Sequence, residues 1–342
     1  MRELTVAAGA ARALMELAVS RGASRTALAE RSRIASADLE DADNRIPFSS
    51  YVALMRAGQE LCNDPALALH FGELVEASEI SISHAVGGAA NLGDAVAQGN
   101  RYAALAVEVE QDGSGDRFRL SRVEGQLWLV DARRNPNAFP ELTESAFARM
   151  VCTMRRFSGG GQFITAVHVT HAEPSYHAEY ERIFRAPVTF GSRWNAVRID
   201  EVLLSSCEFP TAPRYVTGVL RDHAEALLQK LERSQSIRER VERLLIPMLQ
   251  TGEVSIDAIA GALGLSRQTL FRQLRAERTT FEEVLDELRH KLALNYLSVH
   301  KSSVKQTARL VGYSDPSAFS RAFKRWTGLS PRVYVAQGES SG

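Results

Sequence analysis

The sequence predicts an α+β N-terminal domain followed by an all-α C-terminal domain, in which a long helix joins two helix-turn-helix units. Three observations support this. The 342 residues exceed the roughly 100–200 of a typical single domain. Apolar residues change from helical to alternating spacing and back within the first two thirds of the chain. The last hundred residues keep helical spacing and twice place a glycine between two short helices.

The N-terminal domain begins with helices, because apolar residues recur at helical spacing over residues 6–71. Another helix is expected over 92–106. The period changes to two over 107–110, and a turn at 112–115 followed by apolar alternation over 118–130 predicts an antiparallel meander. Four later elements complete the α+β pattern: a helix over 141–157, a strand over 163–169, a helix over 177–184 and a strand over 188–190.

Three segments follow from this reading. An α+β domain for effector sensing and dimerisation is expected over residues 1–213, and the prolines of 208–213 end it. A helical linker is expected over 214–249, whose charged face suits a connection between domains or within a dimer; a solvated face is the alternative. The all-α domain is expected over 250–336.

The first helix-turn-helix unit is expected over about 256–276. Gly264 provides a turn where a positive φ is expected, and Ser266 can cap the next helix. One stripe of that helix at i, i+3, i+4 and i+7 points away from the core, where a recognition helix carries the groups that contact DNA. The stripe consists of Gln268, Phe271, Arg272 and Arg275.

The second unit repeats the plan over about 304–327. Gly312 makes its turn, and Asp315 with Pro316 fits an N-cap followed by proline at the first helical position. Its outward stripe has the same spacing and consists of Ser317, Ser320, Arg321 and Lys324. The helix expected between the units, over 281–299, would span roughly 28 Å, close to the roughly 34 Å between successive major-groove segments on one face of DNA.

Charge is distributed unevenly although the net charge is zero. Residues 237–336 carry 16 Lys and Arg against 10 Asp and Glu, and the rest of the chain carries 25 against 31. A basic module beside an acidic domain is typical of a chain in which one part binds DNA.

The C-terminal hundred residues resemble the DNA-binding domain of AraC/XylS-type regulators. The resemblance rests on Ser266, Leu270, Arg272, Leu274, Arg289, Leu297, Ala308, Gly312, Tyr313, Phe319, Ser320, Arg321, Phe323, Lys324, Gly328, Ser330 and Pro331. It implies a seven-helix DNA-binding module, with dimerisation and effector sensing in the other domain. The N-terminal part is similar to the sensor domain of OruR- and VirS-type regulators at Arg45 to Phe48, Asp64 to Leu67, His171, Pro174, Tyr180, Phe184, Phe190, Gly191 and Asn195.

Individual roles follow from side-chain chemistry. The guanidinium groups of Arg272 and Arg321 can pair with guanine or clamp a phosphate, and a surface ion pair is the alternative. Arg275 and Lys324 are expected to contact phosphates. Phe271 either packs on a thymine methyl group or extends the core.

No metal site, catalytic site or cofactor is expected. His168, His171, Glu173 and His177 have metal-ligating groups, but their spacing matches no established site. The cysteines, Cys62, Cys152 and Cys207, are too scattered for a disulfide framework or a zinc site, and they lack basic or histidine neighbours that would activate a thiol. A DNA-modifying enzyme that carries this module is therefore the weaker alternative.

We expect a sequence-specific transcription regulator, acting as an activator, that binds double-stranded promoter DNA at adjacent major-groove segments. A small apolar or fatty-acid-like effector would control it from the N-terminal domain, and RNA polymerase and a second copy of the chain are the expected protein partners. Neither a signal peptide nor a membrane span is evident, which favours the cytoplasm. A constitutive regulator whose N-terminal domain only dimerises is the alternative.

Overall fold

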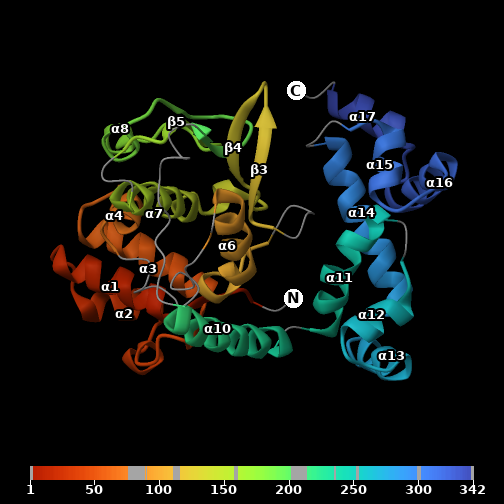
Figure 1. The fold of residues 1–342 in the computed structure, drawn as a ribbon, viewed down its shortest axis with the longest axis horizontal. Coiled ribbons are helices and arrows are strands. Elements are labelled where there is room, and N and C mark those ends of the chain that lie inside the picture. Colours follow the sequence, from red (N-terminus) through yellow and green to blue (C-terminus); the bar gives the residue numbers. More distant parts are fainter. Residues whose placement is uncertain are drawn as a thin grey trace. The chain divides into compact units, whose positions relative to one another are not determined.

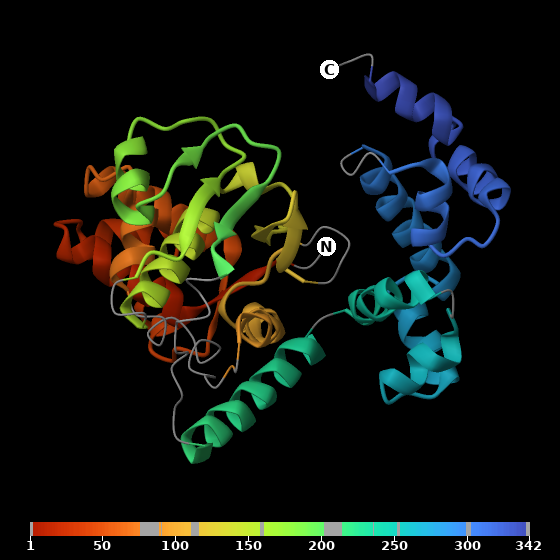
Figure 2. The same ribbon diagram turned by 45° about the horizontal axis from the view of Figure 1, so that its top comes forward.

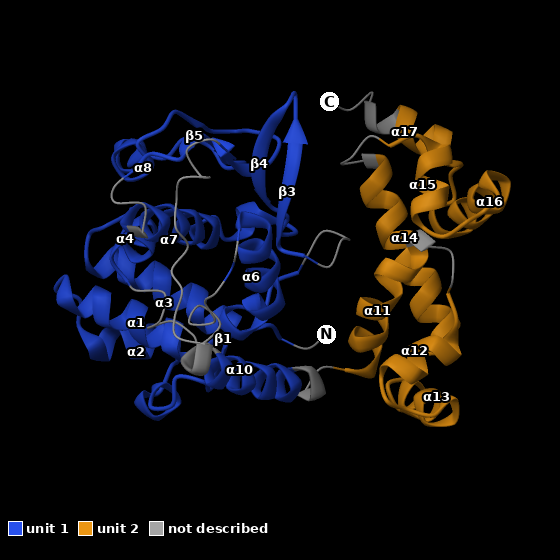
Figure 3. Cartoon of the chain, in the orientation of Figure 1, with its two compact units in different colours: residues 1–111, 116–231 blue, residues 112–115, 232–342 orange. Residues whose placement is uncertain are grey.

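The computed structural model of the chain divides into two compact units (Figures 1 and 3). Unit 1 ends at Leu231, and the C-terminal part of the chain from Glu232 belongs to unit 2. The residues that the structure describes are 3–75, 89, 91–110, 116–157, 161–201, 214–234, 236–251, 254–298 and 302–339. Within these ranges, no helix is long and apolar enough to cross a membrane.

The first part of unit 1 is a helical layer. It contains α1 (Ala8–Ser20), α2 (Arg25–Ser32), α3 (Phe48–Leu61) and α4 (Leu67–Leu74), and a 3₁₀ turn at Ser36–Leu39. Leu14, Leu54, Met55 and Phe71 are buried together in its core, as the helical spacing predicts. Two short antiparallel strands that the spacing did not indicate, β1 (Thr5–Ala7) and β2 (Arg45–Pro47), pair at the edge of these helices.

A five-stranded sheet forms the second part of unit 1, in the order β3-β4-β7-β5-β6 (Figure 2). The strands are β3 (Phe118–Val123), β4 (Gln126–Asp131), β5 (Ile164–His168), β6 (Val188–Thr189) and β7 (Asn195–Ile199). Only the β5–β6 pair is parallel among these strands. The helices α7 (Glu141–Phe157) and α8 (His177–Phe184) bury Phe147, Tyr180 and Phe184 against it.

The strand expected over 107–110 is not formed. Val107 makes only an isolated bridge with Val6. Glu108 is buried, and its carboxylate accepts hydrogen bonds from the backbone N–H and hydroxyl of Thr5, at 3.1 and 2.6 Å. The alternation of valine and glutamate therefore reflects a buried polar contact with β1, and the meander begins only at β3. The turn expected at 112–115 and the boundary at 208–213 lie outside the described residues.

The segment expected as a linker over 214–249 is divided between the two units. Its first helix, α10 (Arg214–Ser234), packs on α6 (Leu92–Ala106) of unit 1 through Ala224 and Leu231. The second helix, α11 (Ile237–Thr251), instead lines the core of unit 2. Both helices are amphipathic because each covers a core, α10 in unit 1 and α11 in unit 2.

Unit 2 is all-α, which confirms the predicted fold class. After α11 its described helices are α12 (Ile256–Ala262), α13 (Arg267–Ala276), α14 (Phe281–Ser298), α15 (Val304–Leu310), α16 (Pro316–Thr327) and α17 (Pro331–Glu339). The pairs α12–α13 and α15–α16 are the two helix-turn-helix units, at separate ends of unit 2, and α14 runs between them (Figure 1). A single apolar core joins all of these helices.

Candidate nucleic-acid interface

The first helix-turn-helix unit is held by two caps and a glycine turn. The hydroxyl of Ser255 caps α12, and the hydroxyl of Ser266 accepts from the N–H of Thr269 at 3.2 Å to cap α13. Gly264 between them has a φ of 67°, the left-handed region that favours glycine. Leu270 and Leu274 are fully buried, which fixes the rotation of α13 about its axis.

The predicted outward stripe of α13 does face away from the core. Gln268, Arg272 and Arg275 are exposed. Phe271 is half-buried but is not part of the apolar cluster of unit 2 within the described residues, so it does not extend the core. These four side chains form one surface of α13.

Sequence reasoning missed Arg267, the first residue of α13. Its guanidinium pairs with Asp257 of α12 at 3.2 Å and lies 5.8 Å from the ring centroid of Phe271. The stacking explains why the Phe271 ring lies along the helix surface. The pair joins two helices whose crossing cannot be predicted from spacing, and the only signal in the sequence is that both residues lie in the first turn of an expected helix.

The second unit has a stronger N-cap. The carboxylate of Asp315 accepts from the N–H groups of Ser317 and Ala318, at 2.9 and 3.1 Å. The Ser317 N–H is the main cause that lowers the pKa of this carboxyl, and the charge of Arg321 lowers it further. Pro316 occupies the first helical position, as predicted.

The outward stripe of α16 is also present, with one difference. Ser317, Arg321 and Lys324 are exposed, whereas Ser320 is half-buried and its hydroxyl donates to the carbonyl of Pro316 at 2.9 Å. The proton of Ser320 is therefore used inside the helix, and only its oxygen can take part in a further contact. Arg272, Arg275 and Lys324 make no hydrogen bond or ion pair within the described parts of the chain.

The turn of the second unit is fixed from two sides. The Arg289 side chain on α14 donates to the carbonyls of Val311 and Gly312, at 3.1 and 3.3 Å. Gly312 has a φ of 78°, and a Cβ there would lie 3.2 Å from the carbonyl oxygen of Leu249. The turn therefore requires glycine, both for its backbone conformation and for the close approach of α11.

The end of α16 is tied to α14 as well. Asp286 accepts from Arg325 at 2.8 Å and from the indole N–H of Trp326 at 2.8 Å. Arg325 is thus neutralised within the protein, whereas Arg321, one turn earlier, makes no hydrogen bond or ion pair with a carboxylate of the described residues. This difference separates the structural arginine of α16 from the one that is available for a ligand.

The metal-ligating residues considered in unit 1 are not brought together. His168 accepts from the indole of Trp194, at 3.2 Å. His171 contacts the hydroxyl of Tyr180 at 2.8 Å, and His177 pairs on the surface with Glu173 at 3.5 Å. Burial and nearby arginines lower the pKa of His168. Each histidine belongs to a different local contact.

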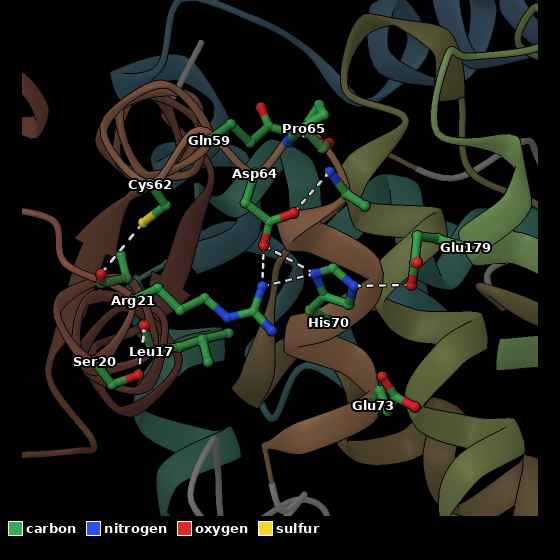
Figure 4. Close-up of polar contacts among 12 residues, drawn as sticks. Leu17, Ser20, Arg21, Gln59, Cys62, Asp64, Pro65, His70, Glu73 and Glu179 are labelled. Atoms are coloured by element: carbon green, nitrogen blue, oxygen red, sulfur yellow. Dashed lines mark hydrogen bonds and ion pairs between the residues drawn. The ribbon is translucent and has the colours of Figure 1, made fainter. Parts of the chain in front are cut away.

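Asp64 of the sensor-like motif joins three helices (Figure 4). It forms an ion pair with Arg21 at the end of α1 and lies 2.9 Å from Nδ1 of His70 on α4. The other ring nitrogen of His70 lies 3.0 Å from the carboxylate of Glu179 on α8. Nearby, the thiol of Cys62 donates to the Ala18 carbonyl, and burial raises its pKa, so it is not an activated nucleophile. These contacts are structural.

Two capped helix pairs with exposed basic stripes, beside an α+β domain, define a DNA-binding transcription regulator with a separate ligand-binding domain. Comparison with protein families agrees. Residues 22–206 match the arabinose-binding N-terminal domain of AraC transcription regulators, and residues 259–337 match a helix-turn-helix domain. The chain therefore belongs to the AraC family.

Similar proteins carry names of regulators. The chain is 29% identical to the ornithine utilization regulator of Pseudomonas aeruginosa over 329 residues. The matched region covers 95% of this chain and 94% of that protein. It is 32% identical over 206 residues to the regulator VirS of Mycobacterium tuberculosis, covering 59% and 58%. The crystal structure of the regulator CdpR from P. aeruginosa is 25% identical and covers 80% of this chain and 87% of that one, with a TM-score of 0.36. The names of the two sequence relatives, together with the helix-turn-helix match, confirm the prediction of a regulator instead of an enzyme.

Proposed function

We propose that this regulator reads promoter DNA through the outward stripes of α13 and α16, inserted into adjacent major-groove segments. The observation that carries the proposal is the presence of exposed basic side chains on the second helix of each unit. The 18 residues of α14 between them span roughly 27 Å, which is compatible with two sites on one face of the duplex. The proposed DNA contacts are Gln268, Phe271, Arg272, Arg275, Ser317, Ser320, Arg321 and Lys324.

The two stripes differ in what they can recognise. The α13 stripe offers the Gln268 amide and the Arg272 guanidinium to base edges, whereas the α16 stripe offers short hydroxyls and a single guanidinium, that of Arg321. Sequence preference is therefore expected to come mostly from α13. Footprinting the purified protein on its own and neighbouring promoters at moderate salt tests the proposal, and absence of any protected site would refute it.

The same proposal extends to control. A small molecule bound in unit 1 changes the geometry of a homodimer and so the half-sites that its DNA-binding units occupy. The regulator acts as an activator, through contact with RNA polymerase, in the cytoplasm where the promoters are. One relative is named for ornithine utilization, which makes ornithine the first effector to try. Measuring reporter expression with and without the effector distinguishes effector control from constitutive regulation. Under effector control expression changes when the effector is added, whereas under constitutive regulation it stays unchanged.

A further inference from the structure

Arg149, on α7 in the interior of unit 1, has an unpaired positive charge. Among the described residues it makes no hydrogen bond or ion pair, and its Nη1 is buried without a partner. Its guanidinium carbon lies 5.0 Å from the ring centroid of Phe71 on α4. Burial lowers the pKa of Arg149 to about 10, so the group is still protonated at neutral pH. An isolated buried charge costs several kcal/mol, unless something compensates it.

The buried carboxylate of Asp131 is already committed to other residues. Asp131 accepts from Arg117 at 3.3 Å and from the hydroxyl of Thr143 at 3.0 Å, and it lies 3.5 Å from Arg133. The two arginines outweigh the effect of burial and hold the pKa of Asp131 below its usual value. This cluster has two cations for one anion, and the charge of Arg117 further disfavours the cation at Arg149. Among the described residues, no carboxylate therefore serves as a counter-ion for Arg149.

A second unused polar group interacts electrostatically with Arg149. Tyr51 on α3 is buried and makes no hydrogen bond in the described parts of the chain. Burial raises its pKa to about 12, so it remains a neutral phenol that can donate. The Arg149 side chain keeps part of its surface accessible although it lies in the interior of unit 1.

The groups are held rigidly. The helices α4 and α7 cross so closely at Gly72 that a Cβ there would lie 2.4 Å from the carbonyl oxygen of Ser145 and 2.7 Å from Cβ of Ala148. Phe71 directly precedes Gly72 on α4 and Arg149 directly follows Ala148 on α7, so both residues lie at this crossing. Such rigidity is what a ligand site needs, because little conformational entropy is lost on binding.

We propose that Arg149, the hydroxyl of Tyr51 and the ring of Phe71 bind the carboxylate of a small organic anion. The inference rests on the proposed control by an effector and assigns that effector a chemical class. A planar guanidinium matches a carboxylate in a bidentate fork, and the phenol supplies a third donor. A guanidinium beside an aromatic ring matches a carboxylate on an apolar body, and inorganic phosphate is the alternative that the experiment excludes.

The first test needs no ligand. Arg149→Met replaces the unpaired charge with an apolar chain, and we expect the unfolding temperature of the full-length protein to rise by about 2 °C or more. The matched control is Arg117→Met, which removes a partner of Asp131 and is expected to lower that temperature. If Arg149→Met lowers it as much as Arg117→Met does, or prevents folding, Arg149 is a structural residue and the site is refuted.

The second test identifies the class. The full chain is titrated with ornithine, glutamate, benzoate and straight-chain carboxylates of two to ten carbons, each beside its amide, and with inorganic phosphate. We expect at least one carboxylate to raise the unfolding temperature while its amide does not. Calorimetry should then show an affinity at least about 10-fold weaker in Tyr51→Phe and in Arg149→Met.

Equal effects of acids and amides, a response to phosphate alone, or no response to any carboxylate would each overturn the assignment. DNA footprinting on the same wild-type preparation keeps the two proposals separate. Carboxylate binding without any footprint would contradict the proposed function and leave the site standing, whereas a footprint without carboxylate binding would do the opposite.

Discussion

Arg321 and Arg325 lie one turn apart on α16 and have different surroundings. Arg325 is bound to Asp286, whereas Arg321 is exposed and interacts electrostatically with Asp315. We expect Arg321→Ala to weaken specific DNA binding by about 1–3 kcal/mol if Arg321 reads a base. Titration of promoter and random DNA by fluorescence anisotropy measures the effect, and Arg325→Ala is the control. Equal losses on both DNAs would mean that Arg321 contacts only phosphate.

Glu144 is the residue whose titration should change stability. It is buried, Tyr176 and Tyr180 donate to it at 2.9 and 2.6 Å, and burial raises its pKa to about 7 from an ordinary value of 4.5. The folded protein therefore keeps this proton up to about pH 7, whereas the unfolded chain releases it near pH 4.5. The contribution of Glu144 to the free energy of unfolding should therefore fall by about 3 kcal/mol as the pH rises from 4.5 to about 7, and should then remain constant.

Urea unfolding at pH 5 and pH 8 measures this, and Glu144→Gln should reduce the difference because glutamine does not titrate. The exposed Glu181 on α8 provides the control, Glu181→Gln, which should keep the full pH dependence. An unchanged pH dependence in Glu144→Gln would contradict the prediction.

At this scale the sequence predicted the outward stripes, because helical spacing alone determines which side chains oppose Leu270 or Phe319. It did not reveal Arg267 or Arg149. A buried arginine and an exposed arginine look the same in a sequence, and only the packing of α7 on α4 distinguishes them. The partner of Arg267 likewise depends on how α12 crosses α13.

At the scale of elements, α11 contacts both helix-turn-helix units. The Glu277 carboxylate, just after α13, accepts from the N–H groups of Ile237 and Arg238, at 2.7 and 3.1 Å, and so caps the start of α11. At its other end Leu249 lies against Gly312 in the turn of the second unit. Contacts with α11, in addition to those with α14, thus fix the position of each helix-turn-helix unit.

The contact at Gly312 predicts a sharp effect of a small change. Gly312→Ala places a Cβ at a left-handed residue and against Leu249, and we expect it to destabilise the protein by about 1–2 kcal/mol. Gly261→Ala is the matched control, because Gly261 lies in α12 with nothing within 4 Å of its Cβ position, and it should stabilise by up to about 1 kcal/mol. Urea unfolding of both variants tests the pair; similar values would refute the steric argument.

For the molecule as a whole, the uneven distribution of charge has a consequence for DNA binding. The basic excess lies in the DNA-binding part, so binding should weaken steeply with salt as counter-ions are released. Arg275→Gln and Lys324→Gln should each reduce the slope of log affinity against log salt by about 1 if each residue contacts a phosphate. Arg31→Gln, in α2 of unit 1, should leave the slope unchanged. A slope unaltered in all three variants would remove both residues from the interface.

Composition and spacing were sufficient for the two-part architecture, since each periodic pattern was long and each turn had its glycine. They were insufficient to assign the boundaries of the two units. An amphipathic helix has the same pattern whether it links two domains or covers a core, so α10 and α11 could not be assigned from sequence. The strand expected over 107–110 was wrong for a similar reason, because alternation does not reveal that Glu108 is buried against Thr5.

The inclusion of α11 in the core of unit 2 decides where this chain can be cut. That core contains four residues of α11, namely Ile237, Val241, Leu245 and Leu249. A fragment of residues 236–339 therefore keeps all the helices that form the core, whereas a fragment that begins at residue 250 lacks these four residues. We expect only the longer fragment to unfold cooperatively when heating is monitored by circular dichroism. Cooperative unfolding of the shorter fragment would contradict this. A DNA-binding fragment intended for fusion to another sensor domain should therefore begin with α11, the helix that the sequence alone would have excluded from it.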